Sequence, residues 1–162
     1  MLEYHIKGQK STDATIRMFN SYGLSGSPSV VINGRRENPM YGPRTTSQYT
    51  SEITKFLGST STVMMEASLT TVARMTVSVE LTNLSTEALQ NARLYAVVYE
   101  DTGTKHNHYL VKDIAQSDHF TLSGRSTASF EIATSIQDSS ARHMVIMCKS
   151  NTGTILQSML VK

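Results

Sequence analysis

The feature that most constrains this chain is the segment 22–34, which reads YGLSGSPSVVING. Gly23 is typical of the residue that follows a helix, because glycine adopts the left-handed conformation at little cost. The Ser27-Pro28 step disfavours helix before the proline, and the β-branched run that follows it predicts a buried strand. Asn33-Gly34 is the dipeptide most typical of a hairpin turn. The segment therefore contains, in close succession, a helix end, a proline step, a strand and a turn.

Short elements are predicted on both sides of this segment. Residues 2–6 alternate between apolar and polar side chains, which predicts a short strand. Ser11, Thr12 and Asp13 are suitable N-caps for the helix that ends at Gly23. The N-terminal part of the chain is therefore expected to combine strands and helices.

A return strand and a second helix are expected after the hairpin signal. The return strand should lie around residues 37–41, where Pro39 implies an edge position or a break. Thr45 or Thr46 then caps a helix that Gly58 ends. Its apolar side chains recur at the spacing of one helix face, at Tyr49, Ile53, Phe56 and Leu57.

From residue 63 onward the spacing of the apolar residues changes from helical to alternating. The preceding residues 58–62, GSTST, form a small polar linker. Strand signals then occur at 63–69, 74–81, 92–100, 108–114, 119–122, 127–134, 143–149 and 154–161. Many short strands separated by turn residues are typical of a β-sandwich. We therefore predict two domains, over residues 1–58 and 63–162.

Composition argues against several classes of partner and function. Lys and Arg number 15 against 13 Asp and Glu, a net charge of +2, and the basic residues are scattered, so nucleic-acid binding is not expected. No run approaches the roughly 18 apolar residues that a membrane-spanning helix requires. The sequence has no G-x-S-x-G nucleophile motif and no glycine-rich phosphate-binding motif. We therefore predict no catalytic residue, no cofactor and no membrane span.

Taken in order, the segments resemble a known arrangement. LEYHI, the helix ending RMFNSYGLSG, Ser27-Pro28, the strand SVVING and the helix SQYTSEITKFL resemble the C-terminal half of a thioredoxin-like domain. The later strands LYAVVYED, HNHYLVKDI and HMVIMCKSNTGTILQS look like the immunoglobulin-like module that follows such a domain in bacterial outer-membrane and secreted lipoproteins of the Omp28 type. The resemblance implies an α+β, partial thioredoxin-like N-terminal domain (1–58) followed by an all-β immunoglobulin-like sandwich (63–162).

The resemblance also implies a role for Ser27 and Pro28. In thioredoxin-like proteins the proline before the central strand is cis, and the residue before it presents its backbone to a bound peptide. Ser27 and Pro28 match these positions and are the candidate peptide-binding residues, although a proline that merely enters a strand would give the same pattern. The first strand and the Cys-x-x-Cys helix of such a domain are missing. The flank of residues 2–6 would then be an exposed sheet edge, which predicts a homodimer through that edge.

Two other groups of residues are candidates for functional sites. His106 and His108 would share one face of a strand, a spacing suitable for two ligands of a metal. No third ligand is evident, so we favour a solvated strand and predict no metal site. Cys148 is the only cysteine and lies in the apolar run HMVIMCKS, which favours a buried strand thiol over a reactive one.

Two functions from different classes fit the sequence. The first is a non-catalytic binding or structural protein of an extracytoplasmic compartment (periplasm, outer membrane or secreted), with a protein or peptide as its partner. The alternative is a fragment of a thiol-disulfide oxidoreductase whose redox cysteines lie upstream of this chain. Because one cysteine cannot form an internal disulfide, we expect the chain as given to be redox-silent and not an enzyme.

Overall fold

The protein is mostly β-sheet. The computed structural model describes residues 2, 4–8, 11–35, 39–71, 73–103, 109–137 and 142–161, of which 47% are in strands and 13% in helices. The two helices are α1 (Asp13–Ser21) and α2 (Thr46–Thr54). The strands are β1 (Ser29–Val30), β2 (Met40–Tyr41), β3 (Val63–Thr71), β4 (Met75–Asn83), β5 (Leu89–Asp101), β6 (Tyr109–Gln116), β7 (Phe120–Leu122), β8 (Thr127–Ala133), β9 (Arg142–Lys149) and β10 (Ile155–Val161).

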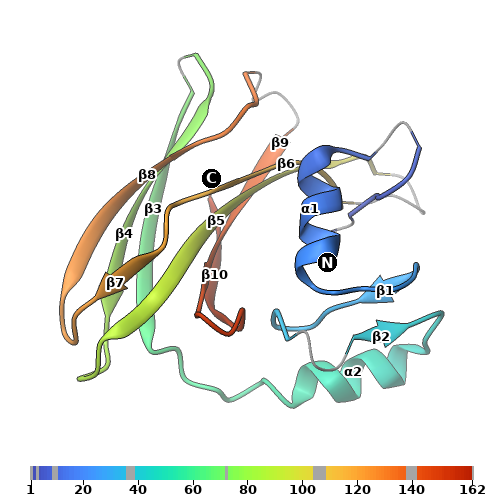
Figure 1. Ribbon diagram of the computed structural model, residues 1–162, viewed down its shortest axis with the longest axis horizontal. Helices are drawn as coiled ribbons and strands as arrows, with labels where there is room; N and C mark the ends of the chain where they lie inside the picture. Colours follow the sequence, from blue (N-terminus) through green and yellow to red (C-terminus); the bar gives the residue numbers. More distant parts are fainter. Residues whose placement is uncertain are drawn as a thin grey trace.

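Two antiparallel sheets pack face to face as a β-sandwich (Figure 1). One sheet has three strands in the order β3-β4-β8, and the other has five, in the order β10-β9-β5-β6 with β7 pairing to β5. Side chains alternate between buried and more exposed along β4, as a strand with one face on a core requires. Both sheets contribute to one core, formed by Val63, Met65, Met75, Val77, Val79, Leu81, Leu94, Ala96, Val98, Leu122, Ile132, Met144, Ile146, Cys148 and Val161.

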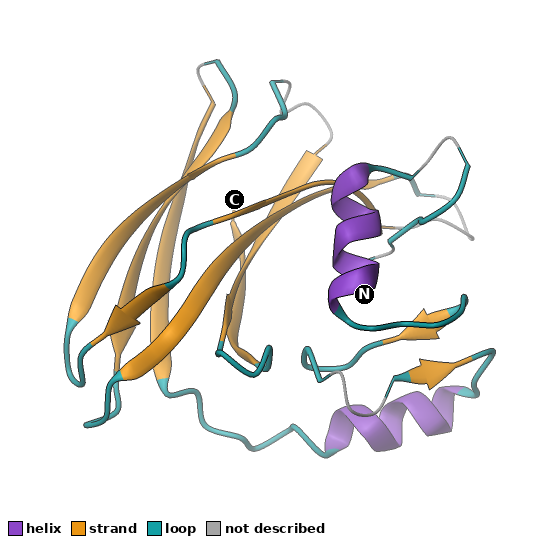
Figure 2. Ribbon diagram, viewed as in Figure 1, coloured by secondary structure: helices purple, strands orange, loops and turns teal. Residues whose placement is uncertain are grey.

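The five-stranded sheet is covered on its second face as well. Val97, Val111 and Met147 form a separate buried cluster on that face, and Leu2 and Tyr4 pack against it. Burial, with a smaller effect from the neighbouring Tyr22 phenol, raises the pKa of Tyr4 above its ordinary value. The helix α1 contacts β6, and Figure 2 shows both helices on the side of this sheet away from the three-stranded one. The N-terminal part therefore forms a third layer on the sandwich.

The helix α1 is built as its sequence predicts. The side chain of Thr12 accepts a hydrogen bond from the amide of Thr15, and the side chain of Thr15 accepts one from the amide of Thr12, which completes a capping box. The hydroxyl of Thr15, which is fully buried, also donates to the carbonyl oxygen of His5 at 2.6 Å. Ala14 and Met18 are buried on the same helix. The capped end of α1 is thus tied to the segment that precedes it.

The turn at Asn33-Gly34 joins the N-terminal layer to the sandwich. Both residues have positive φ, 53° and 70°, as the sequence signal requires. The amide of Ile155 donates to the carbonyl oxygen of Asn33 at 3.1 Å. A Cβ atom added at Gly34 would collide with the carbonyl oxygen of Gly153. Only glycine therefore allows this turn to approach the β9–β10 turn so closely.

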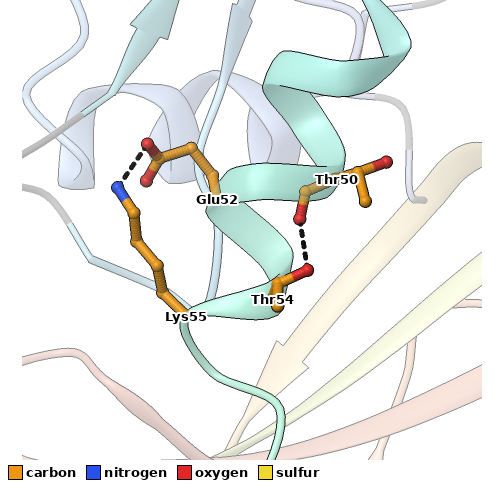
Figure 3. A network of polar contacts seen from close by, with 4 residues as sticks. All are labelled: Thr50, Glu52, Thr54 and Lys55. Atoms are coloured by element: carbon orange, nitrogen blue, oxygen red, sulfur yellow. Dashed lines mark hydrogen bonds and ion pairs between the residues drawn. The ribbon is translucent and has the colours of Figure 1, made fainter.

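The helix α2 has no buried residue. Its N-cap is Thr45, which forms a capping box with Gln48, and Figure 3 shows the polar contacts near its C-terminal end. There the hydroxyl of Thr54 donates to the carbonyl oxygen of Thr50 at 2.7 Å, and the Lys55 ammonium pairs with the Glu52 carboxylate. The predicted apolar face is present in sequence, but Ile53 and Leu57 are 48% and 70% exposed.

The fold class predicted from the sequence is wrong. The chain is predominantly β-sheet with two nine-residue helices, not an α+β thioredoxin-like half followed by an immunoglobulin-like sandwich. The described residues of 2–6 form no strand, and the N-terminal sheet consists of only β1 and β2. The physical reason is that a strand requires a partner, and Leu2 and Tyr4 instead pack their side chains on the five-stranded sheet. The division into domains at 1–58 and 63–162 stays a prediction.

Candidate functional site

The Ser27-Pro28 turn connects α1 to β1. Its peptide bond is cis, and both side chains are exposed. The carbonyl oxygen of Pro28 accepts a hydrogen bond from the amide of Gly42 at 2.9 Å. Because Ser29 pairs with Tyr41, this bond continues the β1–β2 pairing by one residue and ties the backbone of Pro28 to the end of β2.

Tyr41, on β2, lies beside the same turn. Its hydroxyl accepts a hydrogen bond from the amide of Ser25 at 3.3 Å, and its side chain is 38% exposed. Among the described residues, β1 pairs with β2 alone. The other edge of β1 pairs with no described strand, and the exposed aromatic side chain of Tyr41 lies on the neighbouring strand.

An open groove lies between the start of β2 and the helix α2. Its volume is about 610 Å³, and its lining includes Met40, Arg44, Gln48, Glu52 and Lys55. The lining is polar and carries both signs of charge, and Glu52 and Lys55 already neutralise each other. The groove is therefore an open, polar surface and not the enclosed, apolar pocket that is typical of small-molecule sites.

Cys148 lies on β9 and faces the sandwich core. The thiol is fully buried, and burial raises its pKa to about 12. A thiol with this pKa is almost entirely protonated at neutral pH, and the thiolate is the nucleophilic form. The predicted buried strand thiol is confirmed, and it does not belong to the Ser27-Pro28 surface.

Two further features of the sequence are the pair His106 and His108 and the motif Asn83-Leu84-Ser85. His106 and His108 lie outside the described residues. No group of three or more His, Cys, Asp or Glu side chains suited to a metal occurs in the part of the chain that the structure describes. The Asn83-Leu84-Ser85 sequence matches a glycosylation acceptor, but Asn83 is 2% exposed and its amide nitrogen donates to three backbone carbonyls.

A cluster around Lys149 was missed by the sequence analysis. Lys149 is only 6% exposed, and its ammonium lies 4.5 Å from the ring centre of Tyr22 and 5.0 Å from that of Tyr95. Its Nζ donates to the hydroxyl of Tyr22 at 3.0 Å. Arg93 is the cross-strand partner of Lys149. The pairing of β5 with β9 depends on contacts between residues far apart in sequence, so no local signal could find the cluster.

Comparison with known proteins identifies a fold but no family. No protein-family model matches the chain, and no curated protein matches it. The structure is similar to that of HBP35 of Porphyromonas gingivalis, with a TM-score of 0.67 and 15% sequence identity, over 90% of this chain and 55% of that one. This chain therefore spans about half the length of HBP35. At this identity the likeness concerns the fold alone.

Weaker matches were found with parts of two enzymes. One is the alkylpurine DNA glycosylase AlkC of Pseudomonas fluorescens, with a TM-score of 0.42 and 16% identity over 63% of this chain and 31% of that one. The other is a β-glucuronidase of Bacteroides uniformis, with a TM-score of 0.40 and 14% identity over 60% of this chain and 12% of that one. These TM-scores are too low to support any conclusion about this protein. Neither of the described helices has the length and apolar character that crossing a bilayer needs.

Proposed function

We propose that the protein is a non-catalytic module that binds a protein or peptide, or joins a larger structure, outside the cytoplasm. The observation that carries the proposal is the exposed Ser27-Pro28 turn, which is fixed by the bond between Gly42 and Pro28. A rigid, exposed backbone segment binds a partner with little loss of conformational entropy. The extracytoplasmic location rests on the resemblance to outer-membrane and secreted lipoproteins.

The binding surface in this proposal is formed by Ser27, Pro28, Tyr41 and the free edge of β1. An extended peptide would add a strand to β1 through backbone hydrogen bonds. Tyr41 would pack on the side chains of that peptide, because its ring is 38% exposed and its hydroxyl is held by Ser25. Backbone bonds supply affinity in this mode, and the aromatic contact supplies preference for certain sequences.

A peptide library displayed on phage tests this proposal when it is selected against the immobilised protein. The affinity of each selected peptide is then measured by calorimetry for the wild type and for Ser27→Trp, which adds bulk to the exposed turn. The matched control is Ser59→Trp, the same change at an exposed serine after α2. We expect Ser27→Trp to weaken binding by about tenfold or more, the effect of losing roughly 1.4 kcal/mol, and Ser59→Trp to have no effect. Equal binding by all three proteins contradicts the proposal.

An insulin-reduction assay tests whether this chain is non-catalytic, as proposed. The buried Cys148 thiol, with its raised pKa, predicts no acceleration of insulin reduction by dithiothreitol. Cys148→Ala is the matched control, and it should give the same rate as the wild type. Reduction that is faster with the wild type than with Cys148→Ala would favour a redox function for this chain.

A second copy of the chain is one protein partner that the proposal includes. The sequence predicted a homodimer through the flank of residues 2–6, but the described residues of this segment form no strand. A dimer would have to use another edge, such as the free edge of β1. Light scattering at two protein concentrations tests whether the chain dimerises. A molar mass equal to that of the monomer at the higher concentration would contradict a dimer.

A further inference from the structure

We propose that α2 is a docking surface for an anionic lipid bilayer, and that the helix lies in the plane of the bilayer interface without crossing it. This surface, called here the α2 face, consists of four apolar side chains and one cation: Tyr49, Ile53, Phe56, Leu57 and Arg35. It is separate from the Ser27-Pro28 surface, and the proposal does not depend on peptide binding there.

The helix α2 is amphipathic, but its polar side is turned towards the protein. Gln48, Glu52 and Lys55 line the groove that α2 forms with the start of β2. Ile53 and Leu57, which helical spacing places on the other side, are 48% and 70% exposed, and no residue of α2 is buried. A surface helix of a folded protein normally has the opposite orientation, with its apolar side on the core. The apolar side of α2 is therefore open to an apolar partner.

The α2 face is the place where exposed apolar side chains gather. In the described part of the chain, Leu57 and Ile53 are the two most exposed large apolar side chains. Figure 1 shows α2 at the outer edge of the N-terminal layer, beyond β2. The other exposed large apolar side chains lie one to a helix, strand or turn, at Ile16, Tyr41, Met64, Leu84 and Leu160. Apolar side chains exposed singly are ordinary, whereas a group of them marks an interaction site.

The charge around the α2 face selects an anionic partner. Arg35 is exposed, and its guanidinium lies 5.1 Å from the ring centre of Phe56. Residues 1–58 carry seven Lys and Arg against four Asp and Glu, whereas residues 59–162 carry eight against nine. Two copies that met through this face would bring like charges together, which is unfavourable. An anionic bilayer complements both the positive charge and the apolar side chains.

The form of the α2 face fits a bilayer interface. A helix in the interface buries its apolar side at the boundary of the acyl chains and keeps its polar side in water. Ile53 and Leu57 would enter this boundary, and the Arg35 guanidinium would bind lipid phosphates beside them. The helix has nine residues, too few to cross a bilayer, so only an interfacial position is open to it.

Tryptophan fluorescence tests the proposal on the full chain, because the sequence contains no tryptophan. Leu57→Trp places a single reporter on the α2 face. Leu160→Trp, at a 46% exposed position on β10, is the matched control. The probes are vesicles of phosphatidylcholine alone and of phosphatidylcholine and phosphatidylglycerol in equal parts. We expect the emission of Leu57→Trp to move to shorter wavelength with the anionic vesicles only, and the emission of Leu160→Trp to stay unchanged.

Sedimentation with the same vesicles measures binding by the wild type and by variants without a reporter. Ile53→Ser combined with Leu57→Ser should weaken binding to the anionic vesicles by about tenfold or more, because two apolar side chains no longer enter the interface. Leu84→Ser combined with Leu160→Ser removes two exposed side chains elsewhere and should bind as the wild type does.

The charge contribution is tested separately. Arg35→Gln should weaken binding by about fivefold, the effect of removing one cation near an anionic surface. Arg74→Gln changes an exposed arginine in the β3–β4 turn and should have no effect.

Several results would overturn the proposal. They are a wild type that does not bind the anionic vesicles or binds neutral vesicles equally well, and undiminished binding by Arg35→Gln or by the folded Ile53 and Leu57 double variant. A dimer that light scattering detects in the wild type and not in this double variant would assign the α2 face to a second copy instead. If the double variant does not fold, the wild-type comparison of the two vesicles and the Leu57→Trp emission decide.

Discussion

Asn83 is the buried polar residue that organises one end of the sandwich. Its side-chain Nδ2 donates to the carbonyl oxygens of Glu87, Leu122 and Ser123 at 2.8, 3.2 and 3.1 Å. Its Oδ1 accepts a hydrogen bond from the backbone amide of Ser85. One side chain thus ties the turn after β4 to the segment after β7. If the Asn83 side chain were shortened, the backbone carbonyls that accept hydrogen bonds from it would lose this donor.

We predict that Asn83→Ala lowers the free energy of unfolding by about 1–3 kcal/mol, the cost of leaving buried polar groups unsatisfied. Urea denaturation followed by circular dichroism measures the change. Asn151→Ala is the matched control, because Asn151 lies exposed in the β9–β10 turn. An equal effect of the two substitutions would show that the Asn83 network contributes nothing specific.

Cys148 gives a prediction about pH. Burial raises its pKa to about 12 in the folded protein, above the ordinary value of 9.0. Because the unfolded chain ionises first, this thiol stabilises the fold fully below about pH 9 and progressively less as the pH rises towards 12. We expect the stability of the wild type, relative to Cys148→Ala, to fall between pH 8.5 and about 10.5 in urea titrations. A difference that stays constant over this range, or grows, contradicts the assignment.

At the scale of elements, the two helices provide a matched pair of caps. Thr12 caps α1, which buries Ala14, Thr15 and Met18, whereas Thr45 caps α2, which buries nothing. Thr12→Ala should lower the global free energy of unfolding by about 0.5–2 kcal/mol. Thr45→Ala should leave global stability nearly unchanged and increase amide exchange within α2 alone, because a helix without buried contacts opens locally. Equal global losses would contradict the exposed position of α2.

The docking of the 33–34 turn also has a matched control. Gly34 and Gly42 both have positive φ, 70° and 73°, but only a Cβ at Gly34 would meet other atoms within 4 Å, among them the Gly153 carbonyl. Ala at either site should cost about 1–2 kcal/mol from the left-handed backbone. Gly34→Ala should cost more than Gly42→Ala in urea denaturation, since it also separates two turns. If the two variants are equally stable, the turns do not contact each other in solution.

The sequence predicted local elements better than their assembly. Thr12 marks the beginning of α1, and the alternating segments of the second part correspond to strands β3 to β10. Residues 2–6 alternate in the same way but are no strand, because alternation indicates which side chains share a face and not whether a partner strand exists. The apolar face predicted for α2 is exposed for a similar reason. The spacing of Ile53 and Leu57 places them on one face of a helix, but it does not determine whether another element covers that face.

The same contrast between local and long-range signals applies to the residues of interest. Ser27-Pro28 stands out in sequence because proline marks the turn locally, although its function as a binding surface is a proposal. Arg93 and Lys149 are 56 positions apart by their numbers and meet only through the register of β5 with β9. Register is determined by packing across the whole sheet, so this cluster is found only in the folded structure.

The whole molecule is a sandwich with a third layer on one face. Figure 1 shows β1, β2 and α2 on the side of the five-stranded sheet that faces away from the three-stranded sheet. The cluster at Val97, Val111 and Met147 and the contact of Asn33 with Ile155 hold this layer to the sandwich. In this arrangement the sandwich acts as a rigid support, and the N-terminal layer presents the proposed binding surface.

The most direct test of this account is a map of the amide signals that move when a selected peptide binds to the protein labelled with nitrogen-15. The account predicts that the largest shifts occur at residues 25–30 and 41–42, while the amides of the three-stranded sheet stay in place. Shifts concentrated on β3, β4 or β8, with residues 25–30 unchanged, would contradict the proposed binding surface.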